Sequence, residues 1–191
     1  DPLLLIERYG TDALRFALVR EVAGAGQDIR LDFDRKNQTS ATVEASRNFA
    51  NKLWNATRFA LINLEDQDYE NLEKYDSSKL QLSDRWILSR LARVNHETAN
   101  RYENYALGEA AKGLYEFAWN DFCDWYLELI KRRLNCSANL SPDELLDQKI
   151  AKSILYKVLS DLLIMLHPLM PHLTEELWHG LTGSAEDQFL A

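Results

Sequence analysis

The sequence predicts an all-α fold: an antiparallel helix bundle preceded by a short helical segment. Only 7 Gly and 4 Pro punctuate the 191 residues, which favours long helices over a turn-rich β fold. Apolar residues recur at the helical period through four long stretches. The connections between these stretches are short, as expected for antiparallel neighbours in a bundle.

The first forty residues predict two short helices and an extended segment. Pro2 suits the first turn of a helix that Gly10 ends. Thr11 can cap a second helix, which Gly24-Ala25-Gly26 breaks. Ile29, Leu31 and Phe33 then alternate with polar residues, the pattern of an extended strand-like stretch. Residues 34–42 are polar, and we expect a loop.

The first long helix is predicted over residues 42–64, with two contrasting faces. At 100° per residue the apolar stripe is made of Val43, Ala50, Trp54, Thr57 and Leu61, flanked by Phe49, Leu53, Ala60 and Leu64. The opposite face carries amides, one cation and one ring: Asn48, Lys52, Asn55, Asn63 and Phe59. Such groups can hydrogen-bond to bases and stack on them in single-stranded RNA. The alternative is that Phe59 packs under a neighbouring helix.

Further helices are predicted over residues 83–105, 107–134, 141–166 and 174–181. Ser83 is the expected cap of the first, and Ser141 with Glu144 forms a capping box for the third. In the helix over 107–134, the same wheel places Trp125 and Leu129 on the apolar centre line. It places Leu127 among polar residues on the far side.

Composition narrows the possible functions. The net charge of −8 argues against a general phosphate-binding surface, so nucleic-acid contacts would use local basic clusters such as Lys131-Arg132-Arg133. No apolar run approaches the roughly 18 residues that cross a bilayer. Cys123 and Cys136 are expected to be reduced thiols. Because the chain begins at Asp1, we expect it to be part of a longer protein.

No catalytic constellation is predicted. The sequence contains neither a phosphate-cradling glycine loop nor a G-x-S-x-G turn. Glu176 and His179 form one E-x-x-H, whereas a di-iron bundle needs two copies and further glutamates, so we expect no metal site. Asp121 is expected to pair with an arginine of a neighbouring helix, and Asp124 and Glu128 to be solvated.

Four stretches of the chain resemble one family in the right order. Residues 47–59 (RNFANKLWNATRF) and 115–128 (YEFAWNDFCDWYLE) resemble the anticodon-binding region of valyl-tRNA synthetases. Residues 166–178 and the opening, 1–16, are similar to segments shared more loosely with the isoleucyl and leucyl enzymes. The resemblance implies a piece of a class I synthetase that lacks the catalytic signatures.

The resemblance also implies which residues contact the anticodon. Lys52 and Phe59 match the family's lysine and phenylalanine on the first bundle helix, and Leu127 with Glu128 matches its Leu-Glu pair. Arg35 is matched to an arginine that follows the D-I-R-L-D segment. From side-chain chemistry we add Asn55 as a reader of base edges. Lys131, Arg132 and Arg133 are added as contacts to the tRNA backbone.

These expectations define a complete hypothesis. Residues 1–38 would be a stem-contact segment, 39–182 the α-helical anticodon-binding bundle and 183–191 a loose tail. The fragment would be a cytoplasmic monomer that binds the tRNA for valine, not DNA or membrane. It would hold no cofactor and be catalytically inactive, whereas the parent valine–tRNA ligase would use ATP and Mg²⁺. The alternatives are a non-RNA helical scaffold, the same domain of an isoleucyl or leucyl enzyme, and a di-metal bundle oxidase.

Overall fold

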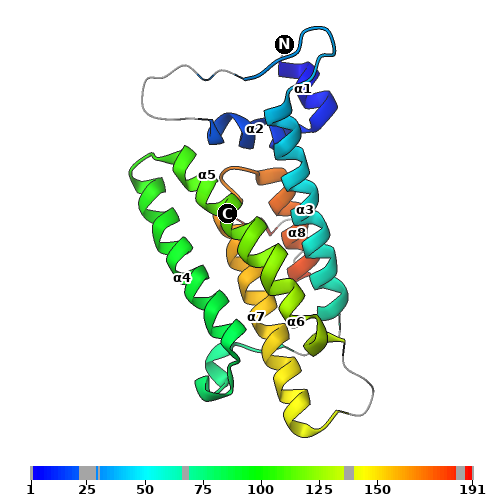
Figure 1. Cartoon of the computed structure of the whole chain (residues 1–191), viewed down its shortest axis with the longest axis vertical. Helices are drawn as coiled ribbons and strands as arrows, with labels where there is room; N and C mark the ends of the chain where they lie inside the picture. Colours follow the sequence, from blue (N-terminus) through cyan, green and yellow to red (C-terminus); the bar gives the residue numbers. More distant parts are fainter. Residues whose placement is uncertain are drawn as a thin grey trace.

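The chain folds into a bundle of antiparallel helices with two short helices across one end (Figure 1). The computed structural model describes residues 2–21, 29, 31–65, 69–135, 140–183 and 188–190. Within those ranges the secondary structure is helical except for one isolated bridge between Asp34 and Thr39. The all-α prediction is therefore confirmed. No helix in the described residues is long and apolar enough to span a bilayer.

Helices α1 (Pro2–Tyr9) and α2 (Thr11–Arg20) lie across the end of α3 (Ala41–Leu64), as Figure 1 shows. The break between them falls at Gly10, whose φ of 90° suits glycine. Gly10 precedes the helix, so Thr11 is its first residue and not its cap. A small second core joins the three helices, made of Leu5, Tyr9, Ala13, Leu14, Ala17 and Val43.

The start of α3 is held by two side chains. The Ser40 hydroxyl accepts a hydrogen bond from the Val43 N–H at 3.3 Å. The Asp32 carboxylate accepts from the N–H groups of Ala41 and Thr42, at 2.7 and 3.1 Å. The Thr42 side chain, with the N–H groups of Thr42 and Ala41 and the Ser40 hydroxyl, stabilises the ionised carboxylate and lowers the pKa of Asp32 to about 2. The predicted extended segment before α3 therefore serves to bring a carboxylate to the positive end of the helix.

The buried face of α3 is centred on the flank of the predicted stripe, although Val43 and Thr57 of the stripe itself are also buried. Phe49, Leu53 and Ala60 are buried, whereas Trp54 is 45% exposed. Two apolar stripes about 100° apart compete on this helix, and packing against η3, α7 and α8 selects the one through Leu53. The assignment of Trp54 to the core was wrong.

A connection with two 3₁₀ turns, η1 (Leu72–Lys74) and η2 (Ser77–Lys79), leads to α4 (Leu82–Glu103). The cap of α4 is Gln81, two residues before the predicted Ser83. The Gln81 N–H donates to the Asp84 carboxylate at 3.0 Å, which satisfies one backbone donor at the helix start.

The predicted helix over 107–134 is continuous but not uniform. It comprises α5 (Leu107–Glu116), the π-helical segment η3 (Phe117–Tyr126) and α6 (Leu127–Leu134). Each π-helical residue turns less about the axis than an α-helical one. Residues after Phe117 are therefore rotated relative to a 100° wheel. Trp125, expected in the core, is 63% exposed, and Leu127, expected on the polar side, is only 7% exposed.

Helix α7 (Pro142–Leu166) runs through the middle of the bundle and is followed by α8 (Pro171–Thr182). The predicted capping box is confirmed: Ser141 accepts from Glu144 N–H at 3.3 Å, and Glu144 accepts from Ser141 N–H at 2.8 Å. Nearly every apolar side chain in the second half of α7 is buried. Helix α8 begins three residues earlier than predicted and ends at Gly183, whose φ is 64°.

Candidate nucleic-acid interface

The side chain of Lys52, on α3, reaches η3, where its ammonium contacts one carboxylate and one aromatic ring. Its Nζ pairs with Asp124 Oδ1 and lies 4.0 Å from the centroid of the Trp119 ring. Lys52 is half-buried and Asp124 is exposed. Asp124 is exposed as expected, but it also has an ion-pair partner that the sequence did not predict. The contact puts a hydrogen-bond donor and an acceptor side by side at the surface.

The π-helical segment is what brings Trp119 and Asp124 to the same ammonium. In an α-helix, residues five apart point about 140° away from each other. In a π-helix, the i to i+5 hydrogen-bond pattern places them close to one turn apart on the same side. The geometry at Lys52 therefore depends on the unusual winding of η3.

Trp119, the ring beside Lys52, is the last of four aromatic rings that contact one another in a row beginning at α2. Phe16 of α2 stacks on Phe49 of α3 with centroids 5.0 Å apart. Tyr115 follows at 5.0 Å and Trp119 at 5.5 Å. Offset aromatic contacts at such distances are favourable. The row thus runs from the N-terminal helices to the ring beside Lys52.

Two other predicted residues share the side of α3 that carries Lys52. Asn55 and Phe59 follow it at i+3 and i+7, a spacing that keeps them on one strip of the helix. Asn55 is exposed, while Phe59 is half-buried and packs against the main core. The structure therefore places Lys52, Asn55 and Phe59 on one strip of α3. It also confirms the alternative that Phe59 packs against neighbouring helices.

The predicted Leu127–Glu128 pair is divided by the structure. Leu127 packs in the core, so its predicted place on a polar face was wrong, and the rotation introduced by η3 is the reason. Glu128 is exposed and accepts a hydrogen bond from Lys131 Nζ at 2.5 Å. Glu128 stays a surface candidate, and it is paired rather than merely solvated.

The basic cluster at the end of α6 is also divided. Arg133 is only 8% exposed, and its guanidinium reaches Asp84 at 2.6 Å and Asp147 at 2.9 Å. These bonds tie α6 to α4 and α7 and leave the Arg133 guanidinium little exposed surface for the predicted contact with a tRNA backbone. Lys131 and Arg132 are exposed.

Arg35 lies in an exposed turn before α3. The Asp34 carboxylate closes this turn by accepting from the N–H groups of Lys36 and Asn37, at 2.8 and 3.2 Å. Helix α3 rises roughly 16 Å between its first residue and Lys52. Arg35 is thus at the far end of α3, and the structure does not bring it beside Lys52.

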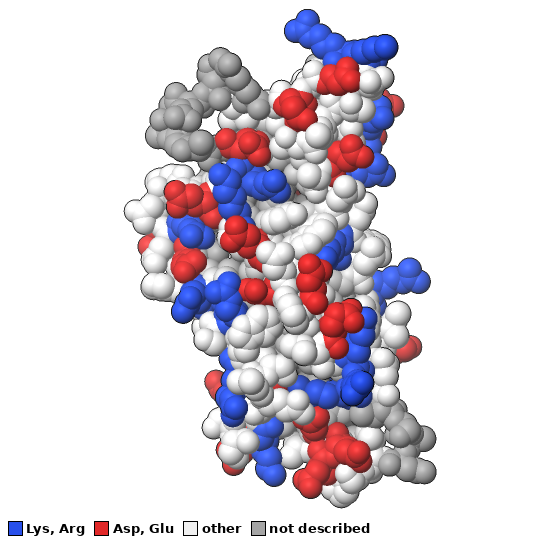
Figure 2. Space-filling view, viewed as in Figure 1, with Lys and Arg blue, Asp and Glu red and all other residues white. Residues whose placement is uncertain are grey.

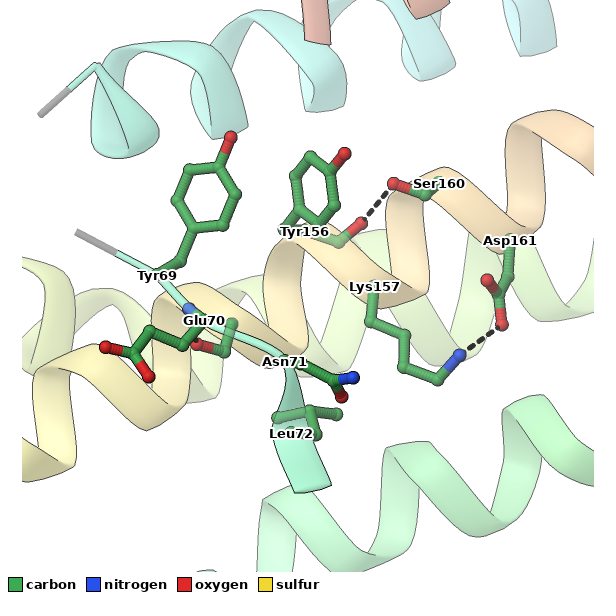
Figure 3. A pocket seen from close by; sticks show the side chains of 9 residues that line it. Tyr69, Glu70, Asn71, Leu72, Tyr156, Lys157, Ser160 and Asp161 are labelled. Atoms are coloured by element: carbon green, nitrogen blue, oxygen red, sulfur yellow. Dashed lines mark hydrogen bonds and ion pairs between the residues drawn. The ribbon is translucent and has the colours of Figure 1, made fainter. Parts of the chain in front are cut away.

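A separate hollow of about 390 Å³ lies between the segment from Tyr69 to Leu72 and helix α7 (Figure 3). Its polar groups bond mainly to one another. Lys157 pairs with Asp161 at 2.9 Å, and Ser160 donates to the Tyr156 carbonyl at 2.8 Å. The rings of Tyr69 and Tyr156 stack at 4.6 Å. These contacts hold the connection against α7, so we assign the hollow a structural role.

The histidine of the E-x-x-H sequence in α8 pairs with a carboxylate one turn before it on the same helix. His179 Nε2 lies 3.1 Å from the carboxylate of Glu175, the residue before Glu176. Across residues 2–21, 29, 31–65, 69–135, 140–183 and 188–190, no group of three His, Cys, Asp or Glu side chains is placed to hold a metal ion.

Arg90 pairs with Asp121 at 2.8 Å, which confirms the predicted partner of that carboxylate.

Burial raises the pKa of the Cys123 thiol to about 12, so this cysteine is a poor nucleophile at neutral pH. Cys136 lies outside the described residues.

Charge is mixed on the face shown in Figure 2. Basic and acidic side chains alternate over the helices there, without an extended basic area. This agrees with the net charge of −8. Such a face is poorly suited to binding through phosphates alone, because phosphate contacts need clustered cations.

Comparison with known proteins places these residues in a family. The model of the family described as the anticodon-binding domain of tRNA ligase matches residues 84–191. The chain is 96% identical over its whole length to a valine–tRNA ligase from Prochlorococcus marinus, covering 20% of that protein. It is 75% identical to the enzyme of that name from Parasynechococcus marenigrum, covering 21%. The chain thus spans about a fifth of these curated relatives.

The fold has a solved counterpart. A crystal structure of a ternary LeuRS–tRNA–LeuAMS complex from Agrobacterium radiobacter K84 matches 97% of this chain with a TM-score of 0.62. The match covers 19% of that protein at 15% sequence identity, so it bears on the fold alone. The match to the family model covers more than half of this sequence, and the chain belongs to the anticodon-binding domains of tRNA ligases.

Proposed function

We propose that the chain is the anticodon-binding part of a valine–tRNA ligase and that it binds the anticodon loop of the tRNA for valine. The observation that carries this is the strip on α3. It carries the Lys52 ammonium, which pairs with the Asp124 carboxylate, the exposed Asn55 amide and the half-buried Phe59 ring. Single-stranded RNA is read by such groups, through base edges and stacking. The identities of 96% and 75% to proteins named valine–tRNA ligase support the choice of amino acid.

The parent enzyme would supply the chemistry. It would join valine to its tRNA using ATP and Mg²⁺, in the cytoplasm, with this segment positioning the anticodon. Residues 1–38 would contact the tRNA stem, and Arg35 at the end of α3 would belong to that contact rather than to the anticodon site. Lys131 and Arg132 would touch the RNA backbone. The segment would act as a monomer and needs no cofactor of its own.

The genetic code fixes which bases should be read. Valine codons share G and U in their first two positions, so valine anticodons share a central A and a 3′ C and differ at the wobble base. A domain that serves every valine tRNA should read the two shared bases and tolerate the third. We expect replacement of either shared base to cost about 1–3 kcal/mol, and replacement of the wobble base to cost little.

The test is a titration of the chain with anticodon stem-loops that differ at one base, together with valylation of full tRNA variants by the full-length ligase. Asn55→Ala should weaken binding, while Asn95→Ala, which removes an exposed amide of α4, should not. Equal sensitivity at all three anticodon positions would reject this mode of reading. No sensitivity at any position would reject anticodon binding and favour a helical scaffold.

A further inference from the structure

Asp124 is an unexpected neighbour for a lysine that would touch RNA. A carboxylate at an RNA site repels phosphates, and pairing with Lys52 reduces the charge that the lysine offers them. The ion pair would therefore weaken a purely electrostatic contact. It suits a site that discriminates between bases by their donors and acceptors.

The two side chains have fixed and opposite hydrogen-bonding characters. The Lys52 ammonium only donates, whereas the ionised Asp124 carboxylate only accepts. Asp124 uses Oδ1 for Lys52, and its other oxygen, Oδ2, belongs to the same exposed carboxylate. A ligand that approaches the pair thus meets a donor and an acceptor next to each other.

Only some base edges complement that pattern. Adenine and cytosine carry an exocyclic amino group, a donor, beside a ring nitrogen that accepts. Guanine and uracil present the reverse order at these positions, a carbonyl oxygen beside a ring N–H, so in the same register their carbonyl oxygen would face the carboxylate acceptor to acceptor. With the amino group placed at Asp124 and the ring nitrogen at Lys52, the pair therefore favours adenine and cytosine over guanine and uracil.

We propose that Asp124 is a specificity-determining residue, which accepts a hydrogen bond from the amino group of an adenine or cytosine in the anticodon while Lys52 donates to the adjacent ring nitrogen. Trp119 is a positioning residue that holds the ammonium in place through its ring face. The inference rests on the proposed function. The two bases shared by valine anticodons, A and C, are both of the amino class.

The decisive variant is Asp124→Asn in the full-length ligase. An asparagine amide both accepts and donates, so it can serve a carbonyl base as well as an amino base. The measurement is kcat/KM for valylation of tRNAs with A or G at the central position and C or U at the 3′ position. In the unmodified enzyme we expect about a ten- to hundred-fold preference for A and for C. In Asp124→Asn, one of these ratios should fall to within a few-fold of unity.

The matched control is Asp121→Asn. Asp121 lies on the same segment η3, but it pairs with Arg90 of α4. Its replacement should leave both ratios unchanged. Asp124→Glu keeps a carboxylate, so most of the preference should return. This rescue separates base recognition from a general loss of folding.

The outcomes are distinct for the two proposals. If the unmodified enzyme does not distinguish A from G or C from U, the proposed anticodon reading is wrong. If it does, and Asp124→Asn keeps both ratios, then Asp124 does not determine specificity. An equal loss of preference in Asp121→Asn would also overturn the inference, because it would show an effect of helix stability and not of a base contact.

Discussion

Basic residues in this chain differ in whether a ligand can reach them. The difference depends on whether the carboxylate that each one pairs with is exposed or buried. Lys52 and Arg133 both pair with carboxylates, but Lys52 does so at the surface and Arg133 in the interior. A sequence with an excess of acidic residues provides such partners for many cations. The Lys131-Arg132-Arg133 cluster predicted three surface cations. In the structure two of them, Lys131 and Arg132, are exposed.

Replacing Arg133 should be severe and replacing its neighbour mild. Arg133→Ala leaves Asp84, which is fully buried, without its cation, and we expect a loss of about 3–5 kcal/mol in the free energy of unfolding. Arg132→Ala, at an exposed position, should change it by about 0.5 kcal/mol or less. Urea unfolding of the two variants measures the difference. Equal effects would contradict the burial of Arg133.

Three aromatic residues of α3 should rank by burial. Phe49→Ala empties a fully buried site and should cost about 3–5 kcal/mol. Phe59→Ala removes a half-buried ring and should cost less, about 1–3 kcal/mol, scaling with the apolar area lost. Trp54→Ala should cost about 1 kcal/mol or less, because 45% of the residue is exposed. Thermal or urea unfolding would give the order, and a Trp54 effect as large as that of Phe49 would restore the wheel assignment.

The extents of the helices were predictable here, but the faces that they bury were predictable only in part. Capping residues, glycines and prolines mark where helices start and stop, so the capping box at Ser141 and the extent of the helix over 107–134 were predicted. A 100° wheel assumes α-helical winding throughout, and η3 breaks that assumption. Two features of the sequence indicated that a simple wheel would fail. The helix over residues 42–64 has two apolar stripes, and the wheel for residues 107–134 leaves Leu127 among polar residues.

At the candidate site, helical spacing predicted which residues share a face, but it did not predict their partners on other elements. Helical spacing alone placed Lys52, Asn55 and Phe59 on one strip. Asp124 and Trp119 were missed as partners of Lys52, because on an α-helical wheel they point to different sides. Asp32 was missed as a cap, since it precedes α3 by nine residues and reaches it only through the folded turn.

The start of α3 should show a defined pH dependence. The folded-state pKa of Asp32 is lowered from 3.8 to about 2, so the ionised carboxylate stabilises the fold at higher pH. That contribution is complete above about pH 4 and is lost as the pH falls through about 2. Asp32→Ala should cost about 0.5–2 kcal/mol at neutral pH, as for other capping side chains.

The difference in stability between the variant and the unmodified chain should shrink as the pH falls from 4 to 2 and disappear below about pH 2. Thermal melts between pH 2 and 7 would test this. A gap that persists unchanged at low pH would show that the Asp32 contribution is not carried by its charge.

Charge over the whole molecule determines how it should meet a polyanion. With a net charge of −8 and mixed charges on the face seen in Figure 2, the molecule offers few cations to phosphates. Binding should depend mostly on base contacts and stacking, which screening by salt affects little.

Affinity for the anticodon stem-loop should therefore fall only gently with salt. Each phosphate contact on single-stranded nucleic acid contributes a slope of about −0.7 in log K against log salt concentration. With contacts from Lys131 and Arg132 we expect a slope of about −1 to −2. Titrations at several salt concentrations give this value, and Lys131→Ala should make it shallower. A slope steeper than about −4 would indicate a broad phosphate contact, contrary to the charge distribution.

The row of rings from Phe16 to Trp119 has a practical consequence for anyone who expresses this region. An expression clone begun at residue 84, where the family match starts, would omit Phe49 together with the whole of α3. One begun at Ala41 would keep Phe49 but leave its ring uncovered by Phe16. Boundaries drawn from the family match would therefore yield a chain that exposes apolar surface and tends to precipitate. Because Leu5 and Tyr9 of α1 pack with the apolar residues of α2 that carries Phe16, a clone should begin before α1.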